Sequence, residues 1–209
     1  MKTLTTALMT AGALLAATSA SANFVSDGDF SSPSGGPSYI EYAGGSTMGP
    51  WTVTGDSVDL IGGYWQSPTG TGSVDLDGAN PGGLTQSLTL AAGSYTLTFD
   101  LSGNPDGGIP LKTVDVSIGN VTDHAFTFLT GSNTHSNMEY VLETLYFTTT
   151  GNTTLTFDSA DLTGSPYGPV IGNVSVTSGT PEPATWGLMI LGFAGLGAMA
   201  RSRRKLAAA

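Results

Sequence analysis

The sequence predicts an all-β protein, a β-sandwich of the jelly-roll form. Between residues 23 and 180, no window of a dozen residues shows the 3.6-residue period of a helix, whereas alternation with period two recurs. In 94–101, for example, the apolar Tyr95, Leu97, Phe99 and Leu101 alternate with polar residues. Gly, Pro, Asn and Asp cluster between such runs, at 79–83, 103–108 and 164–169, and these residues favour turns. Many short strands divided by turns are typical of a sandwich.

Twelve segments are expected as strands, because β-branched and aromatic residues favour this conformation. The early ones are short runs with Tyr, Trp or Val beside Gly, Pro or Asp, and the later ones are longer runs rich in Val, Thr, Leu and Phe. In chain order they are 24–30, 39–42, 51–54, 57–61, 72–77, 84–90, 94–101, 113–118, 124–130, 138–149, 153–158 and 170–176. We expect one domain over 23–177, since a chain of this length can bury a proper core.

The N-terminal segment 1–22 has the pattern of a secretory signal peptide. Lys2 supplies the positive charge, an apolar run covers 7–17, and the small residues Ala20 and Ala22 precede the expected cleavage site. The apolar run is too short to be a lasting membrane span. The chain is therefore expected to be exported, and with no cysteine it forms no disulfide after export.

The C-terminal segment predicts a single membrane anchor. A short linker and a Pro-Glu-Pro triplet over 178–183 lead into 184–200, which has 17 residues without a charge. A helix of this length spans roughly 25 Å, a little less than a hydrocarbon core of about 30 Å. The basic tail 201–209 should stay in the cytoplasm under the positive-inside rule. We expect a transmembrane helix over 184–200.

The same tail resembles the PEP-CTERM sorting signal of Gram-negative bacteria. The resemblance rests on a triplet, an interfacial tryptophan, an apolar span and an arginine cluster in fixed order: Pro181, Glu182, Pro183, Trp186, Arg201, Arg203 and Arg204. It implies recognition by an integral-membrane exosortase, and processing of the tail. The implied location is transient anchoring in the inner membrane, followed by delivery to the cell surface or extracellular matrix.

The charge of the exported part restricts its partners. Fifteen of the 16 acidic residues but only Lys112 among the six basic ones lie within 23–180, which gives a net charge of −14. Nucleic acid is excluded as a partner, because phosphate binding needs a Lys or Arg surface. Neutral polymers and divalent cations remain possible partners, and the charge is also explained by solubility alone.

Aromatic and polar residues in Gly- and Pro-rich loops predict a carbohydrate site. Sugar rings stack on aromatic planes while amide and carboxylate groups bind hydroxyls. The candidate residues are Tyr64, Trp65, Gln66, Asn104, Asp106 and Tyr167. Trp51 is interpreted as a core residue, while the 64–66 loop is equally compatible with a core role.

Enzyme signals are weak, and we expect no catalytic activity. The sequence contains neither a zinc-binding His or Cys cluster nor a Gly-x-Ser-x-Gly motif, and His124 and His135 are interpreted as surface residues. Glycosidases use paired carboxylates, and Asp75 and Asp77 are expected on one face of a strand. Glycoside hydrolysis by this pair is the less favoured alternative.

A second resemblance covers nearly the whole exported domain. Eight motifs follow one another in order and are similar to the "choice-of-anchor C" family of exported proteins: 27–30 (DGDF), 49–53 (GPWTV), 57–59 (SVD), 64–66 (YWQ), 73–76 (SVDL), 83–86 (GLTQ), 99–106 (FDLSGNPD) and 167–169 (YGP). The resemblance implies a galactose-binding-like jelly roll that binds carbohydrate. It also suggests a structural Ca²⁺ near Asp27 and Asp29, although relatives have Asp-Asn-Val where this chain has Gly172-Asn173-Val174.

These observations predict an exported surface or matrix protein that binds carbohydrate without catalysis, in association with exopolysaccharide or biofilm. A purely structural, Ca²⁺-dependent matrix protein is the alternative.

Overall fold

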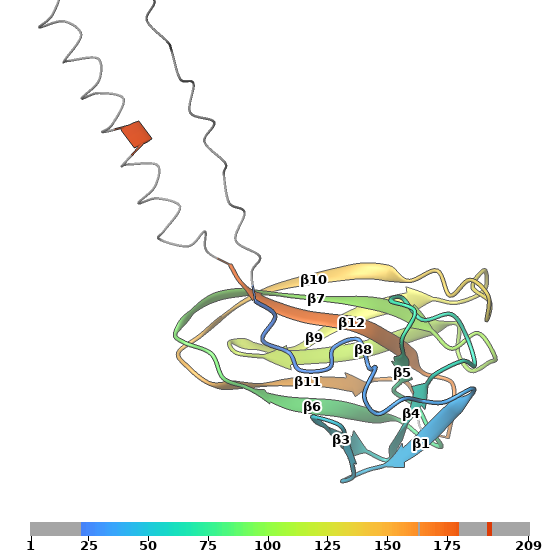
Figure 1. The fold of residues 1–209 in the computed structure, drawn as a ribbon. Helices are drawn as coiled ribbons and strands as arrows, with labels where there is room; N and C mark the ends of the chain where they lie inside the picture. The colour runs from blue at the N-terminus through green and yellow to red at the C-terminus, as the bar shows by residue number, and fades with distance from the viewer. Residues whose placement is uncertain (1–21, 163, 180–191, 194–209) are drawn as a thin grey trace, which may run out of the picture.

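The computed structural model describes residues 22–162, 164–179 and 192–193, and the first two ranges form a sandwich of two six-stranded sheets (Figure 1). The first sheet has the order β1 (Tyr39–Ala43), β4 (Ser57–Ile61), β5 (Ser73–Asp75), β12 (Pro169–Ser178), β7 (Gly93–Gly103) and β10 (Val141–Thr149). The second has the order β2 (Thr47–Met48), β3 (Trp51–Gly55), β6 (Gly82–Leu88), β11 (Thr153–Ser159), β8 (Leu111–Ile118) and β9 (Val121–Leu129). All strand pairs given by the register are antiparallel, and the predicted all-β sandwich is confirmed.

The strand predicted over 24–30 is wrong, and β2 was not predicted. Residues 24–30 run beside β12 with bonds from Phe24 N to Val176 O (2.9 Å) and from Val174 N to Gly28 O (2.8 Å). Asp27 and Phe30 have φ angles of 51° and 52°, in the left-handed region rather than the β region of a regular strand. The other eleven predicted segments each overlap an observed strand.

The main core lies between the two sheets and follows the alternation seen in the sequence. Leu97, Phe99 and Leu101 on β7 are fully buried, whereas the intervening residues are partly exposed or polar. Trp51 is also fully buried, its ring packs near Phe157 with centroids 6.4 Å apart, and its Nε1 donates to Asp27 O at 3.1 Å. The interpretation of Trp51 as a core residue is confirmed.

A second, smaller core covers the outer face of the first sheet. On β4, Val58 and Leu60 belong to the main core, whereas Ile61 packs with Trp65, Met138 and Val170 in a separate cluster. Since side chains alternate between the faces of a strand, Asp59 and Ile61 project to the outside of the sandwich. Loops folded over this face create the setting for the site described below.

Most of the predicted targeting segments lie outside the described residues. This applies to the signal peptide 1–22 except Ala22, to the Pro-Glu-Pro triplet, to the basic tail 201–209 and to the helix 184–200 except residues 192–193. Within the described ranges, no helix is long and apolar enough to cross a membrane.

Candidate functional site

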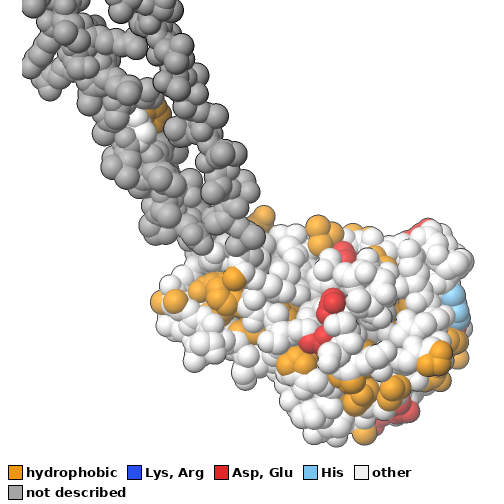
Figure 2. Space-filling model, viewed as in Figure 1, with side chains coloured by type: hydrophobic (Ala, Val, Ile, Leu, Met, Phe, Trp, Pro, Cys, Tyr) orange, Lys and Arg blue, Asp and Glu red, His pale blue; other side chains and the backbone are white. Residues whose placement is uncertain are grey.

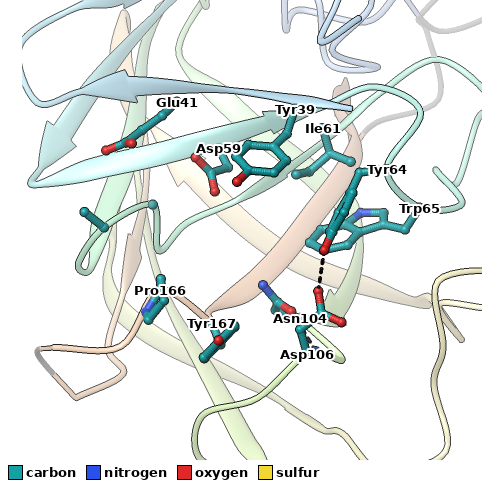
Figure 3. Close-up of a pocket in the computed structure, with 12 residues that line it drawn as sticks. Tyr39, Glu41, Asp59, Ile61, Tyr64, Trp65, Asn104, Asp106, Pro166 and Tyr167 are labelled. Atoms are coloured by element: carbon teal, nitrogen blue, oxygen red, sulfur yellow. Dashed lines mark hydrogen bonds between the residues drawn. The ribbon is translucent and has the colours of Figure 1, made fainter. Parts of the chain in front are cut away.

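A cavity of about 410 Å³ lies on the outer face of the first sheet, between its β1–β4 edge and four loops (Figure 3). One wall is formed by the strands β1 and β4, and the other by the loops that follow β4, β5 and β7 and the loop that precedes β12. The lining residues are Tyr39, Glu41, Asp59, Ile61, Tyr64, Trp65, Gly78, Ala79, Asn104, Asp106, Pro166 and Tyr167.

The strand wall is set by the register of β1 and β4. Tyr39 pairs with Ile61, and Glu41 pairs with Asp59, so both pairs present their side chains on one face. In Figure 3 the Asp59 carboxylate lies beside the Tyr39 ring, and Glu41 lies farther along the same wall. The wall therefore combines an aromatic plane with two acceptor groups.

The loop wall is organised by a chain of hydrogen bonds. Asp106 accepts from Tyr64 Oη at 3.0 Å, and its other carboxylate oxygen lies 2.7 Å from His135 Nε2. Asp106 N donates to Asn104 Oδ1 at 2.9 Å, and Asn104 Nδ2 donates to Asp75 Oδ2 at 2.7 Å. The chain links the outer tyrosine to a buried carboxylate of β5, which fixes the loops against the sheet.

Lys112 supports the same loops from below. Its side chain is fully buried, and Nζ donates to Gly107 O at 2.9 Å and to Tyr167 O. Asp161 Oδ2 lies 4.0 Å from Nζ. The single lysine of the described chain thus connects the two loops that carry Asn104, Asp106 and Tyr167.

Burial raises the pKa of several carboxyl groups in and under the cavity. For Asp59, burial and then the charge of Glu41 raise the pKa to about 6. Burial raises the pKa of Asp75 well above its usual value, against the opposing hydrogen bonds from Asp77 N and Asn104. Burial is also the main cause of a pKa of about 6 for Asp77. The floor of the cavity is therefore a region where negative charge is costly.

The structure brings together five of the six residues predicted for carbohydrate binding. Tyr64, Trp65, Asn104, Asp106 and Tyr167 line one cavity, although they come from three loops. Gln66 is not among the lining residues, and its Oε1 accepts from Met138 N at 3.0 Å. Their role in binding stays a prediction.

The two aromatic residues of the 64–66 loop have different environments. Trp65 is only 5% exposed, and its Nε1 donates to Ser73 Oγ at 3.1 Å, so it is mainly part of the small outer core. Tyr64 is 38% exposed, with its ring centroid 4.7 Å from that of His135. Tyr64 therefore offers more ring surface to a ligand than Trp65 does.

The sequence analysis did not identify Tyr39, Glu41 and Asp59 as lining residues of the cavity. It also missed the contacts of His135 with Asp106 and Tyr64. Tyr39 and Glu41 stand two residues apart on a predicted strand, which already placed them on one face. What the pattern could not provide was the pairing of β1 with β4, which adds Asp59. His135 was interpreted as an isolated surface residue, whereas its ring contacts Tyr64 and its Nε2 contacts Asp106.

The two residues suggested for Ca²⁺ lie in a turn away from this cavity. Asp27 Oδ1 accepts from Ser31 N at 2.9 Å and from Ser32 N at 3.0 Å, which closes the turn. Among the described residues, no group of three or more His, Cys, Asp or Glu side chains could hold a metal ion. A Cβ at Gly172 would meet Pro68 Cγ at 2.6 Å, so an Asp at this position, as in the relatives of the resemblance, does not fit this packing. Calcium binding stays a prediction.

The carboxylate pair considered for glycoside hydrolysis is inaccessible. Asp75 and Asp77 are both buried, and neither lines the cavity. Asp75 is the last residue of β5, while Asp77 lies beyond the strand in a single bridge with Pro81. Both Asp75 oxygens accept hydrogen bonds, from Gly168 N and Asn104 Nδ2 among others. The positions of these carboxylates give no support to hydrolysis by this pair.

Comparison with family models matches the chain in two parts. Residues 23–177 match the family described as "Protein of unknown function (DUF642)", and residues 180–205 match the "PEP-CTERM protein-sorting motif". The PEP-CTERM resemblance inferred from the C-terminal residues is confirmed, whereas the "choice-of-anchor C" assignment stays a prediction.

Individual proteins show similarity over the sandwich. Halomucin of Haloquadratum walsbyi is 32% identical over 155 residues, which are 72% of this chain and 2% of halomucin. The chain thus corresponds to a small part of that protein. The solved structure of TmCBM61 in complex with β-1,4-galactotriose superposes with a TM-score of 0.53 at 17% identity, over 76% of this chain and 99% of that one. A family 35 carbohydrate-binding module from Clostridium thermocellum superposes with a TM-score of 0.45 at 14% identity, over 68% of this chain and 98% of the module.

Proposed function

The chain belongs to the DUF642 family and carries a PEP-CTERM sorting motif, and from these premises we propose that it is an exported, non-catalytic protein that binds carbohydrate. The ligand is a polysaccharide of the cell surface or extracellular matrix. In this proposal, residues 1–22 direct export, 184–200 anchor the chain briefly in the inner membrane, and an exosortase processes the tail.

The observation that carries the binding role is the composition of the cavity. Its volume of about 410 Å³ is within the usual range for small-ligand sites, and exposed tyrosine rings stand beside carboxylate and amide groups. Tyr39 is 49% exposed and Tyr64 38%, so both rings can stack on a sugar face. The TmCBM61 structure, whose fold is similar, holds a β-1,4-galactotriose.

The position of the cavity fits a surface-attached receptor. The two ends of the sandwich meet at one end of the molecule, where Asn23 Oδ1 accepts from Val176 N at 3.0 Å (Figure 1). The β1–β4 edge and its loops lie toward the opposite end. A chain held through its C-terminal tail would therefore present the cavity away from the point of attachment.

Binding is tested with residues 23–179, which contain both sheets and the main core. The protein is applied to a glycan array and to the exopolysaccharide of the source organism, beside Tyr64→Ala and the control Tyr146→Ala. Tyr146 is exposed on β10 and does not line the cavity. We expect the parent to bind and Tyr64→Ala to lose about tenfold or more in affinity. The control Tyr146→Ala should bind with the affinity of the parent. A parent protein that binds no glycan would refute the proposed function.

A further inference from the structure

The Glu41–Asp59 pair places two carboxylates on one wall of the cavity. The residues are directly opposite in the antiparallel β1–β4 ladder, which puts their Cβ atoms about 4.5–5.5 Å apart. Both residues line the cavity, and Figure 3 shows their side chains on the same wall. Like charges in this arrangement destabilise a sheet, and the charge of Glu41 contributes to the raised pKa of Asp59. A cation between the two groups would relieve this repulsion.

The described part of the protein offers no side chain that could act as this cation. Lys112 is the one Lys or Arg within residues 22–179, and it is buried against the carbonyls of Gly107 and Tyr167. The ion pairs among the described residues involve Asp161 and Asp106, not Glu41 or Asp59. The face in Figure 2 likewise shows no Lys or Arg among its described side chains. Above the pKa of about 6 of Asp59, where both carboxyl groups are charged, the compensating charge comes from a bound molecule or from solvent ions.

The tyrosine rings distinguish between kinds of cation. Tyr39 and Tyr64 line the same cavity with ring centroids 5.4 Å apart and planes at 71°, so they present two differently oriented faces. Aromatic faces attract organic ammonium groups and the C–H faces of sugars. A bare Ca²⁺ instead needs six to eight oxygen ligands, and the described residues hold no suitable group of three acidic or His side chains. The arrangement favours an ammonium group attached to a sugar.

We propose, on the basis of the carbohydrate-binding role above, that the cavity selects glycans with a free amine, such as deacetylated hexosamine polymers. The ammonium lies between the Glu41 and Asp59 carboxylates, and the ring of the amino sugar packs against Tyr39 or Tyr64. Uronic-acid and sulfated glycans are rejected, because the cavity carries Glu41, Asp59 and Asp106 and the domain has a net charge of −14.

The test compares glycans that share a backbone and differ in charge. Oligosaccharides of glucosamine and of galactosamine are each measured against their N-acetylated counterparts and against a uronic-acid oligosaccharide, by calorimetry at about pH 6.5. This pH lies above the pKa of about 6 of Asp59, so its carboxylate is mainly ionised. We expect the free amine to bind about tenfold more tightly on at least one backbone, and the preference to shrink in high salt.

Two variants assign the preference to the carboxylate pair. Asp59→Asn keeps the shape of the side chain. In this variant, free-amine and N-acetylated glycans should bind with nearly equal affinity, while neutral glycans still bind. Asp115→Asn removes the same charge from β8, outside the cavity, and should leave the preference unchanged. N-acetylated glycans that bind as tightly as the free amines on both backbones would overturn this inference but leave the proposed function standing. Absence of binding to every glycan would overturn both.

Discussion

At the residue scale, the aromatic side chains of the cavity have two roles: some are buried and support the cavity, and others are exposed to a ligand. Trp65 packs with Ile61, Met138 and Val170 and is 5% exposed, whereas Tyr39 is 49% exposed. Trp65→Ala should lower the free energy of unfolding by about 3–5 kcal/mol, because it leaves a large cavity. Tyr39→Ala should cost about 1 kcal/mol or less and weaken glycan binding instead. Urea denaturation and binding measured on both variants check this. If Trp65→Ala is as stable as the parent and loses only glycan binding, the structural role is wrong and Trp65 stacks on the sugar instead.

Lys112 is the residue whose loss should affect the loop wall most. Its ammonium connects the 104–108 and 164–168 loops through two carbonyls and lies near the buried Asp161 carboxylate. Lys112→Met should lower the free energy of unfolding by about 3 kcal/mol or more, since it leaves a buried carboxylate without its cation. Adding Asp161→Asn should restore part of the loss, because Asn can still accept from Thr113 N. Urea denaturation measures both, and a Lys112→Met protein as stable as the parent would contradict this role.

At the scale of elements, the strands of the sandwich were predictable and the N-terminal segment was not. Alternation marked 94–101 and 113–118 clearly, because one face of each strand is buried in the main core. Residues 24–30 carry apolar residues at both ends, which suggested a strand. The left-handed conformations of Asp27 and Phe30 depend on tertiary contacts, such as the bond from Trp51 Nε1 to Asp27 O, that no local pattern reveals.

Gly28 tests how this segment is held against β12. A Cβ at position 28 would lie 1.9 Å from Val174 O, a backbone atom that cannot move aside cheaply. Gly28→Ala should therefore displace the segment, break the bond from Val174 N to Gly28 O and cost about 1–3 kcal/mol. Gly151→Ala is the control, since a Cβ there meets no atom within 4 Å. Thermal unfolding compares the two, and equal melting temperatures would show that the segment adapts without loss.

At the scale of the whole molecule, the sequence predicted one wall of the cavity better than the other. Tyr64, Asn104 and Tyr167 were recognisable because aromatic and amide residues gather in Gly- and Pro-rich loops, although Asn104 proved to be only 6% exposed. Glu41 and Asp59 looked like ordinary polar positions of two strands, and only the β1–β4 register brings them together. Site residues carried by loops leave a compositional trace, whereas those created by strand pairing depend on topology.

The whole sandwich should become more stable on mild acidification. Seven carboxyl groups of the described chain have a raised pKa with burial as the main cause, and for Asp59 and Asp77 the value is about 6. Between about pH 4 and pH 6 the folded state therefore binds more protons than the unfolded state, whose carboxyl groups titrate near 3.8. The resulting stability is fully present below pH 3.8 and is lost as the pH rises through 6.

Thermal unfolding at about pH 5 and at about pH 8 measures this effect. We expect a melting temperature a few degrees higher at the lower pH, in keeping with a domain of this size. Asp59→Asn should raise the melting temperature at pH 8, where the parent carries an unfavourable charge beside Glu41, and should change it little at pH 5. Asp115→Asn is the matched control on β8. It should reduce the difference in melting temperature between pH 5 and pH 8 less than Asp59→Asn does. If the parent protein is instead most stable at pH 8, the negative charges of these carboxylates are compensated by other groups in the folded state. The electrostatic reason for placing a sugar ammonium between Glu41 and Asp59 would then be lost.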